Sequence, residues 1–461
     1  MNNMNHAIKR LLLMGVLLIL TTTSCSDQAV DYYNSGNAKR ANGDLDGAER
    51  DYQRAVSLKP GYAEAHYNLG TLVLQKGRVD QAMMEFQKAL QLKPDYAEAH
   101  YNLGLAKESK GDLDGAIADW TKAIELKPGY EHAYYDRGSA KEVRGDLDGA
   151  MADYGKAIEL QPEDADAYVV RGNARIAKRD VAGAISDYTK AIELKPDASY
   201  AYCDRGIAKK ANGDLEGAIA DYTKAIQFKP DHANAYYGRG IAKKARGDIE
   251  GAIADYAKAI ELKPDYAKAY GGRGNAKKTK GDFEGAMADY SKAIELNPKS
   301  ARAYHNRGCL RYDSHDFTDA LVDFQKALGL DPSSDYAHFR VWLIRTRLGE
   351  GEAATTELRF YMGGRHAGKP NDWPSKIGHF LAGQLTETEF LAAAKNADRN
   401  TEAGQLCEAY FYSGSKHLFA GEKALAMEYF QKSIATDEKT FIEYDSAAAE
   451  LKFLSVKEVK P

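Results

Sequence analysis

The sequence predicts an all-α solenoid, a row of helical hairpins that ends in a C-terminal helical cap. Nine of the twelve prolines recur at intervals of 34 residues, and a fixed period of this length is typical of repeat architectures. Within each period, apolar and small residues follow the three- and four-residue spacing of helices. A mean hydropathy of −0.55 excludes a multi-span membrane protein. The periodic prolines are Pro60, Pro94, Pro128, Pro162, Pro196, Pro230, Pro264, Pro298 and Pro332.

The N-terminal segment has the features of an export signal. Basic residues precede an apolar run over residues 11–20, and small residues follow up to Cys25, which predicts a signal peptide over residues 1–24. The apolar run is too short for a stable membrane span, which needs about 20 residues. The segment resembles the lipobox of bacterial lipoproteins, with Thr22 where that family usually has Leu. This resemblance implies that Cys25 is lipidated and that residues 25–28 are the lipidated N-terminus; the alternative is an ordinary signal peptide.

The residue after the cysteine indicates whether the protein is expected in the inner or the outer membrane. Ser26 follows Cys25, whereas an aspartate there would favour the inner membrane, so we expect a lipid-anchored protein of the bacterial outer membrane that faces the periplasm. Cys203, Cys309 and Cys407 lie too far apart for a disulfide framework or a metal site, and we expect small buried residues.

Residues 29–334 are nine repeats of 34 residues, in which each residue has a position from 1 to 34. In repeat 3, residues 97–130, the spacing of small and apolar residues predicts a first helix around Ala99 and Ala106 and a second from Leu113. Gly111 and the following aspartate separate the two helices. Each repeat is therefore expected to be a helical hairpin.

The repeats share a large residue at position 4, Gly at 8, Ala at 20 and 27, an aromatic residue at 24 and Pro at 32. In repeat 4 these are Tyr134, Gly138, Ala150, Tyr154, Ala157 and Pro162. This pattern resembles the tetratricopeptide repeat (TPR) family. The resemblance implies a superhelix that binds proteins or extended peptides on its concave side, through positions 2, 5, 9 and 12 of the first helices.

Six repeats carry an arginine at position 7 together with an aspartate at position 23. We interpret each pair as a structural ion pair between the two helices of a hairpin, with phosphate binding by the arginines as the alternative. The pairs are Arg137 with Asp153, Arg171 with Asp187, Arg205 with Asp221, Arg239 with Asp255, Arg273 with Asp289 and Arg307 with Asp323.

The period fades in the C-terminal region, residues 335–461. Residues 335–368 keep the rhythm of a hairpin, Thr386 opens a helix with a capping box, and residues 407–440 return to the repeat pattern. Residues 441–454 are expected to form a terminal capping helix.

The same region resembles the C-terminal half of the NlpI family of outer-membrane TPR lipoproteins. The residues that carry this resemblance are Trp373, Phe380, Leu381, Gly383 and the segments 408–414, 426–430 and 441–454. The resemblance implies a periplasmic adaptor that presents cell-wall endopeptidases to a processing protease, and a homodimer.

A ladder of tyrosines and asparagines marks the expected ligand groove. Tyrosine recurs at position 5, and in three repeats asparagine follows it, so amides are available for a peptide backbone and rings for its side chains. The alternative is that the tyrosines mainly pack against the next helix. The ladder residues are Tyr33, Asn34, Tyr67, Asn68, Tyr101, Asn102, Tyr135 and Tyr237.

The charge of the groove changes sign along the array. Position 12 runs from acidic residues in repeats 3 and 4 to Lys210, Lys244 and Lys278, and position 2 changes in the same sense. This predicts a ligand whose acidic part lies on repeats 6–9, with drift among duplicated repeats as the alternative. Asn275 and Asn306 match two positions of the TPR carboxylate clamp, but its lysine positions hold other residues.

The sequence offers no catalytic, metal or cofactor motif, so we expect no enzyme and no cofactor. A net charge of −4 argues against nucleic acid as a partner. The function that these observations favour is a membrane-anchored periplasmic adaptor that binds envelope proteins or peptides. The alternative is a structural assembly factor of the outer membrane, of the pilotin or barrel-assembly type.

Overall fold

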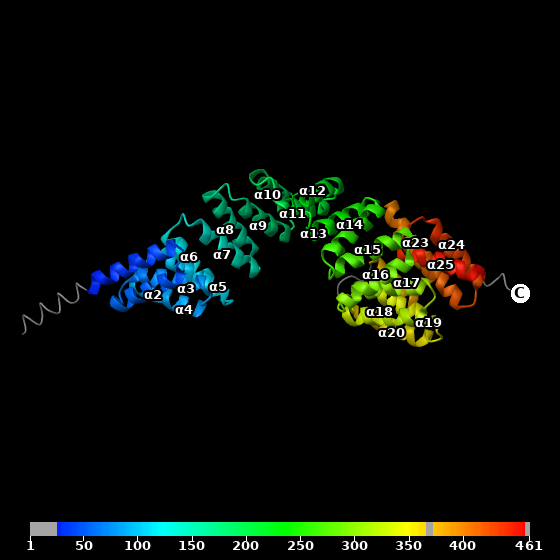
Figure 1. Ribbon diagram of the computed structural model, residues 1–461. Helices are drawn as coiled ribbons and strands as arrows, with labels where there is room; N and C mark the ends of the chain where they lie inside the picture. The colour runs from blue at the N-terminus through cyan, green and yellow to red at the C-terminus, as the bar shows by residue number, and fades with distance from the viewer. Residues whose placement is uncertain (1–24, 366–371, 457–461) are drawn as a thin grey trace, which may run out of the picture. The chain divides into compact units, whose positions relative to one another are not determined.

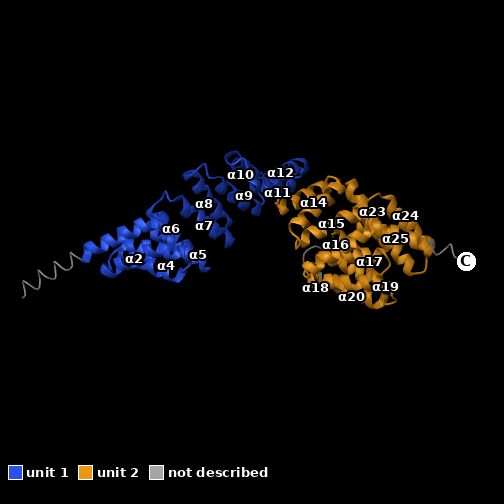
Figure 2. Cartoon of the chain, viewed as in Figure 1, with its two compact units in different colours: residues 1–229 blue, residues 230–461 orange. Residues whose placement is uncertain are grey.

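A computed structural model describes residues 25–365 and 372–456. The predicted signal peptide, residues 1–24, lies outside the described residues. All regular elements in the described part of the chain are α-helices (Figure 1), which confirms the predicted class. The chain divides into two compact units, residues 1–229 and 230–461 (Figure 2).

Unit 1 contains the helical hairpins of repeats 1–6. Its first helix covers residues 25–41, so Cys25 begins the helix that is also the first helix of repeat 1. The other helices are α2 (Leu45–Leu58), α3 (Ala63–Gln75), α4 (Val79–Leu92), α5 (Ala97–Ser109), α6 (Leu113–Leu126), α7 (Glu131–Val143), α8 (Leu147–Leu160), α9 (Ala165–Ala177), α10 (Val181–Leu194), α11 (Ser199–Ala211) and α12 (Leu215–Phe228).

Unit 2 contains repeats 7–9 and the C-terminal region. The helices of the repeats are α13 (Ala233–Ala245), α14 (Ile249–Leu262), α15 (Ala267–Lys280), α16 (Phe283–Leu296), α17 (Ala301–Asp313) and α18 (Phe317–Leu330). The C-terminal region adds α19 (Asp335–Arg347), α20 (Gly351–Arg365), α21 (Trp373–Leu381), α22 (Glu387–Ala393), α23 (Arg399–Phe419), α24 (Lys423–Ala435) and α25 (Ile442–Val456).

In most repeats the turn inside the hairpin depends on a glycine and an aspartate, but Arg179 and His315 replace the glycine in repeats 5 and 9, and Arg78 replaces the aspartate in repeat 2. In repeat 3, Gly111 has a φ of +81°, a left-handed conformation that favours glycine and ends α5. The carboxylate of Asp112 then accepts a hydrogen bond of 2.9 Å from the backbone N–H of Gly115, which caps the start of α6. The predicted break between the two helices is confirmed.

The two helices of a hairpin approach closely because position 8 has no side chain. A Cβ atom on Gly138 would lie 2.9 Å from the ring of Tyr154, the aromatic residue at position 24 of the same repeat. Tyr154 is 1% exposed, and the equivalent aromatic side chains are buried in all nine repeats. Larger residues at position 8 would force the two helices apart.

The predicted ion pairs lie between the helices of the six hairpins. In repeat 6, Asp221 accepts hydrogen bonds of 2.8 Å from both Nε and Nη2 of Arg205, and Lys209 contacts the same carboxylate at 2.9 Å. The Asp221 side chain is 5% exposed and the Arg205 side chain 15% exposed. The other five arginine–aspartate pairs have the same two-point geometry, which confirms a structural role.

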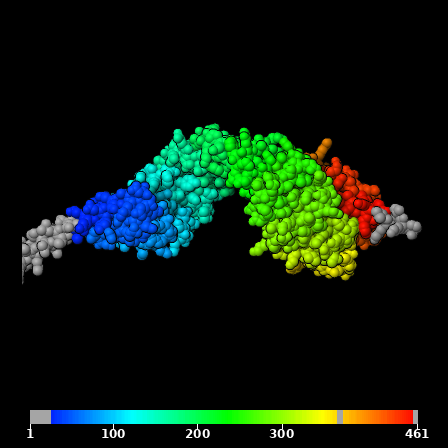
Figure 3. Space-filling view, in the orientation of Figure 1, coloured from blue at the N-terminus to red at the C-terminus, as the bar shows by residue number. Residues whose placement is uncertain are grey.

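The C-terminal region packs against the repeats of unit 2, as the space-filling view shows for its orange and red helices (Figure 3). The capping box at the start of α22 is confirmed, since Thr386 and Glu389 exchange hydrogen bonds. Helix α25 lies against α17 and contributes acidic side chains to three ion pairs. These pairs are Lys278 with Asp445 (2.9 Å), Arg340 with Glu443 (3.1 Å) and Arg347 with Glu450 (2.9 Å).

We predict that Asp221→Ala destabilises the protein more than Arg205→Met. The first change leaves Arg205 and Lys209 without their shared carboxylate, which costs about 3 to 5 kcal/mol when the charges are buried. The second leaves Asp221 paired with Lys209, so the loss should stay below about 2 kcal/mol. Urea denaturation followed by circular dichroism measures both, with the exposed Lys224→Met as the control. Equal losses in the two variants would contradict a buried, shared carboxylate.

Candidate ligand grooves

The ladder in unit 1 is held together by hydrogen bonds between neighbouring repeats. In three pairs of neighbouring repeats, the side chain at position 5 is hydrogen-bonded to the side chain at position 6 of the next repeat. Each bond fixes the first helices of the two repeats relative to each other. The bonds run from Asn68 Nδ2 to Tyr33 Oη (3.2 Å), from Asn102 Nδ2 to Tyr67 Oη (3.0 Å) and from Tyr101 Oη to Asp136 Oδ2 (2.7 Å).

The ladder tyrosines also pack on the tyrosine that precedes the next repeat. The ring centroids of Tyr67 and Tyr96 are 4.8 Å apart, and Tyr33 and Tyr62 are 4.9 Å apart. The sequence predicts that the asparagine amides bind a peptide backbone, but the structure uses the Asn68 amide between repeats. The ladder therefore connects repeats, while the binding of a peptide to it stays a prediction.

Two carboxylates beside the ladder make this part of unit 1 acidic. Burial raises the pKa of Asp136 above its ordinary value, and burial together with the Asp136 charge raises that of Glu108. Tyr135 lies in the same repeat as Asp136 and packs on Tyr154, with 5.8 Å between the ring centroids. A further negative ligand group would be repelled here.

Unit 2 contains a cavity of about 370 Å³ between the first helices of its repeats, α13, α15 and α17. Three cations line it: Lys244, Lys268 and Arg302. None of the residues around it, all of which the structure describes, carries a carboxylate. The polar and aromatic residues of this basic groove include Tyr237, Tyr256, Asn275, Tyr290, Asn297, Ser300 and Asn306.

The cavity exists because repeat 8 has no side chain at position 5. Gly271 occupies the place that Tyr237 has in repeat 7, and a Cβ atom built on Gly271 would meet nothing within 4 Å. The neighbouring Gly272 allows a close approach, since its Cβ atom would lie 2.9 Å from the Tyr256 ring. The repeat pattern alone accounts for these glycines as first-helix residues. The signal that indicates the cavity is a glycine at a position where five other repeats have tyrosine.

The cations of the basic groove repel one another. Burial lowers the pKa of Lys244, and the nearby charges of Arg302 and Lys278 lower it further. Lys244, Lys268 and Arg302 have no ion-pair partner among the residues that the structure describes. An anionic group in the cavity would relieve this repulsion, so the site is suited to a carboxylate or another anion.

Two of the expected groove residues have different surroundings. Lys278 contacts Asp445 of α25 at 2.9 Å, so its charge already has a partner within the chain, and a ligand contact at this residue stays a prediction. Lys210 belongs to α11 of unit 1 and is half-buried. The clamp-position asparagines bind each other, because Asn306 Nδ2 donates to Asn275 Oδ1 at 2.9 Å.

The cysteines and the other titratable groups show no further site. Cys203, Cys309 and Cys407 are free and buried, as expected, whereas Cys25 is exposed. Burial raises the pKa of the Cys309 thiol to about 12, which keeps it unreactive. Within residues 25–365 and 372–456, no group of His, Cys, Asp and Glu side chains is arranged to hold a metal ion. None of the helices in these ranges has the length and apolar character of a membrane span.

Models of the tetratricopeptide repeat match more than half of the chain. The model described as a TPR repeat matches residues 36–77, 72–111, 144–178, 208–245, 242–281 and 274–314. Two models described as the tetratricopeptide repeat match residues 97–130, 165–198 and 301–334.

Several solved structures are similar over part of the chain. A MamA crystal structure is 30% identical, covers 38% of this chain and 95% of its own, and has a TM-score of 0.35. YrrB, described as a TPR protein with an unusual peptide-binding site, is 26% identical, with coverages of 40% and 95% and a TM-score of 0.36. A TPR protein from Parabacteroides merdae is 21% identical, with coverages of 54% and 98% and a TM-score of 0.45. No curated protein matches the chain.

Proposed function

Because the chain is a tetratricopeptide repeat protein, a class of protein-interaction scaffolds, we propose that its basic groove binds an extended acidic segment of a partner protein. One observation carries this proposal. Lys244, Lys268 and Arg302 converge on a cavity that has no carboxylate in its wall. Unpaired cations in a partly buried groove destabilise the free protein and favour an anionic ligand, because the ligand removes their repulsion.

The chain itself supplies an example of the contact that we propose. Asp445 of α25 pairs with Lys278, the cation at position 12 of repeat 8. Lys244 has the same position in repeat 7 and faces the open cavity instead. An acidic residue of a partner would bind Lys244 as Asp445 binds Lys278.

We propose that the protein is tethered to the bacterial outer membrane through lipidated Cys25 and faces the periplasm. Cys25 is exposed, and three residues separate it from residue 29, where repeat 1 begins. Since residues 25–41 form one helix, a lipid on Cys25 would hold repeat 1 close to the membrane surface. Two acyl chains would suffice for stable attachment.

We further propose that the protein is an adaptor without catalytic activity, which recruits envelope proteins such as cell-wall hydrolases and a processing protease. The resemblance of residues 335–454 to the NlpI family supports this function and a homodimer. Co-purification from detergent-solubilised membranes separates this function from the alternative. Hydrolases or proteases would support the adaptor, whereas secretin or barrel-assembly subunits would support an assembly factor.

The groove is tested by reversing its charge. A fluorescein-labelled peptide of four Glu-Gly-Ala units, blocked at both ends, should bind the wild type more tightly at about 50 mM than at about 200 mM salt. In the double variant Lys244→Glu with Lys268→Glu, affinity should fall at least about tenfold, because two attractive contacts become repulsive, and the salt dependence should flatten. Fluorescence anisotropy measures both, and thermal melting verifies that the variant is folded.

The matched control for this variant is Lys258→Glu with Lys292→Glu. These lysines belong to the second helices of repeats 7 and 8 and are 39% and 40% exposed, and the change in net charge is the same. The control should retain affinity within about twofold. Equal losses in the two double variants would mean that net charge alone, and not the groove, attracts the peptide.

The anchor is tested by Cys25→Ala in a bacterial host. The variant should move from the membrane fraction to the soluble periplasmic fraction, and it should lose incorporation of an alkyne analogue of palmitate. Ser26→Ala is the neighbouring control and should remain in the membrane. Label that persists in Cys25→Ala, or is absent from the wild type, would contradict lipidation at this residue.

A further inference from the structure

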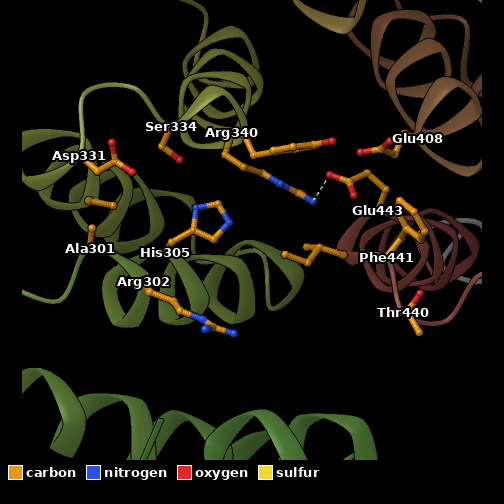
Figure 4. A pocket seen from close by; sticks show the side chains of 13 residues that line it. Ala301, Arg302, His305, Asp331, Ser334, Arg340, Glu408, Thr440, Phe441 and Glu443 are labelled. Atoms are coloured by element: carbon orange, nitrogen blue, oxygen red, sulfur yellow. Dashed lines mark hydrogen bonds and ion pairs between the residues drawn. The ribbon is translucent and has the colours of Figure 1, made fainter. Parts of the chain in front are cut away.

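A second cavity lies where repeat 9 meets the C-terminal region (Figure 4). Its volume is about 430 Å³, which falls within the range of small-molecule sites, about 300 to 1,000 Å³. The walls come from α17, α18, α19, α23 and the start of α25, so the C-terminal region has to be folded to complete it. Arg302 lines both this cavity and the basic groove, whereas the other charged residues in its wall belong to it alone.

One histidine in the wall has an unused hydrogen-bonding atom. The Nδ1 atom of His305 is buried and has no hydrogen-bond partner in the described part of the chain. Burial lowers the pKa of His305 to about 4, and the charges of Arg340 and Lys278 act in the same direction, so the ring is neutral at pH 7. An unpaired buried polar atom is unfavourable, and a ligand in the cavity would supply its missing partner.

The wall of this cavity contains ionisable groups of both signs. Arg302 and His305 come from α17 and lie on the same side of the cavity as Asp331, while Glu408 and Glu443 lie on the opposite side, where Arg340 reaches Glu443 (Figure 4). Arg302 is exposed and has no ion-pair partner among the described residues. Glu443 pairs with Arg340 at 3.1 Å. A ligand that carries both an anionic and a cationic group would match the two sides.

The acidic side can accept an additional positive charge. Glu408 is 2% exposed and accepts a hydrogen bond of 2.5 Å from Trp373 Nε1. Burial and the Glu443 charge raise the pKa of Glu408 to about 8, so the carboxyl group holds a proton at pH 7. A ligand ammonium group beside it would stabilise the carboxylate, and the proton would then be released to solvent.

We propose that this cavity binds a free amino acid or a short peptide as a zwitterion. The ligand carboxylate lies at Arg302 and His305, and the ligand amino group lies at Glu408 and Glu443. This activity is separate from the binding of an acidic protein segment, because it requires both free termini of a small molecule. The blocked peptide used for the basic groove has neither terminus, so the two proposals can fail independently.

Isothermal titration calorimetry of the full mature chain with alanine dipeptide and tripeptide tests the site. At pH 7, at least one of the two should bind, with release of a proton that appears as a dependence of the heat on the ionisation enthalpy of the buffer. The N-acetylated and the C-amidated forms should each bind at least about tenfold more weakly, because each lacks one charge. Absence of binding by both free peptides, or equal binding of the free and blocked forms, would overturn the proposal.

Two substitutions assign the ends of the ligand. Arg302→Gln should reduce the preference for the free over the amidated peptide, and Glu408→Gln should remove both the proton release and the preference for the free over the acetylated peptide. Glu408→Gln is isosteric and keeps an acceptor for Trp373, and Glu428→Gln on the exposed face of α24 is the control. Proton release that persists in Glu408→Gln would contradict the placement of the amino group.

Discussion

The close contact between the glycine at position 8 and the aromatic ring at position 24 is the constraint on which every repeat depends. The contact recurs from Gly36 against Tyr52 to Gly308 against Phe324. In each repeat, a Cβ atom on the glycine would lie within 3.2 Å of the ring. Because this contact and the small residues around it fix the hairpin, the residues that face the groove are free to differ between repeats. Differences in ligand binding are therefore expected from the residues at the groove positions, because the framework of the hairpins hardly changes between repeats.

The charged residues of the repeats fall into two groups: those paired inside the hairpins and those that face the groove. Inside the hairpins, each aspartate at position 23 of repeats 4–9 is shared by an arginine at position 7 and a second cation at position 11, so these cations are paired within the fold. The concave cations of unit 2 differ. Lys278 is neutralised by α25, and Lys244 faces a cavity without a carboxylate. The basic groove thus ends at Lys278, where Asp445 of α25 supplies an acidic side chain from the chain itself.

The sequence predicts the features that depend on local pattern. The period, the hairpins, the capping box at Thr386 and the pairing of Arg205 with Asp221 follow from residue spacing, since all of them join residues within one repeat or one helix start. The sequence does not predict contacts between distant segments. Nothing in the spacing places Asp445 on Lys278, and the use of the Asn68 amide between repeats depends on the packing of two hairpins. The cavity at Gly271 results from the absence of a side chain. A search of the sequence for functional side chains does not find it.

The most direct test of the basic groove as a site for an acidic segment is zero-length crosslinking of the blocked Glu-Gly-Ala peptide to the protein with a carbodiimide. The reagent joins a carboxylate to a lysine amine only when the two are in contact, and mass spectrometry identifies the lysine. We predict crosslinks at Lys244 and Lys268, with far lower yields at Lys258 and Lys292 on the second helices of the same repeats. Equal yields at the four lysines, or crosslinks confined to unit 1, would contradict the assignment of this groove.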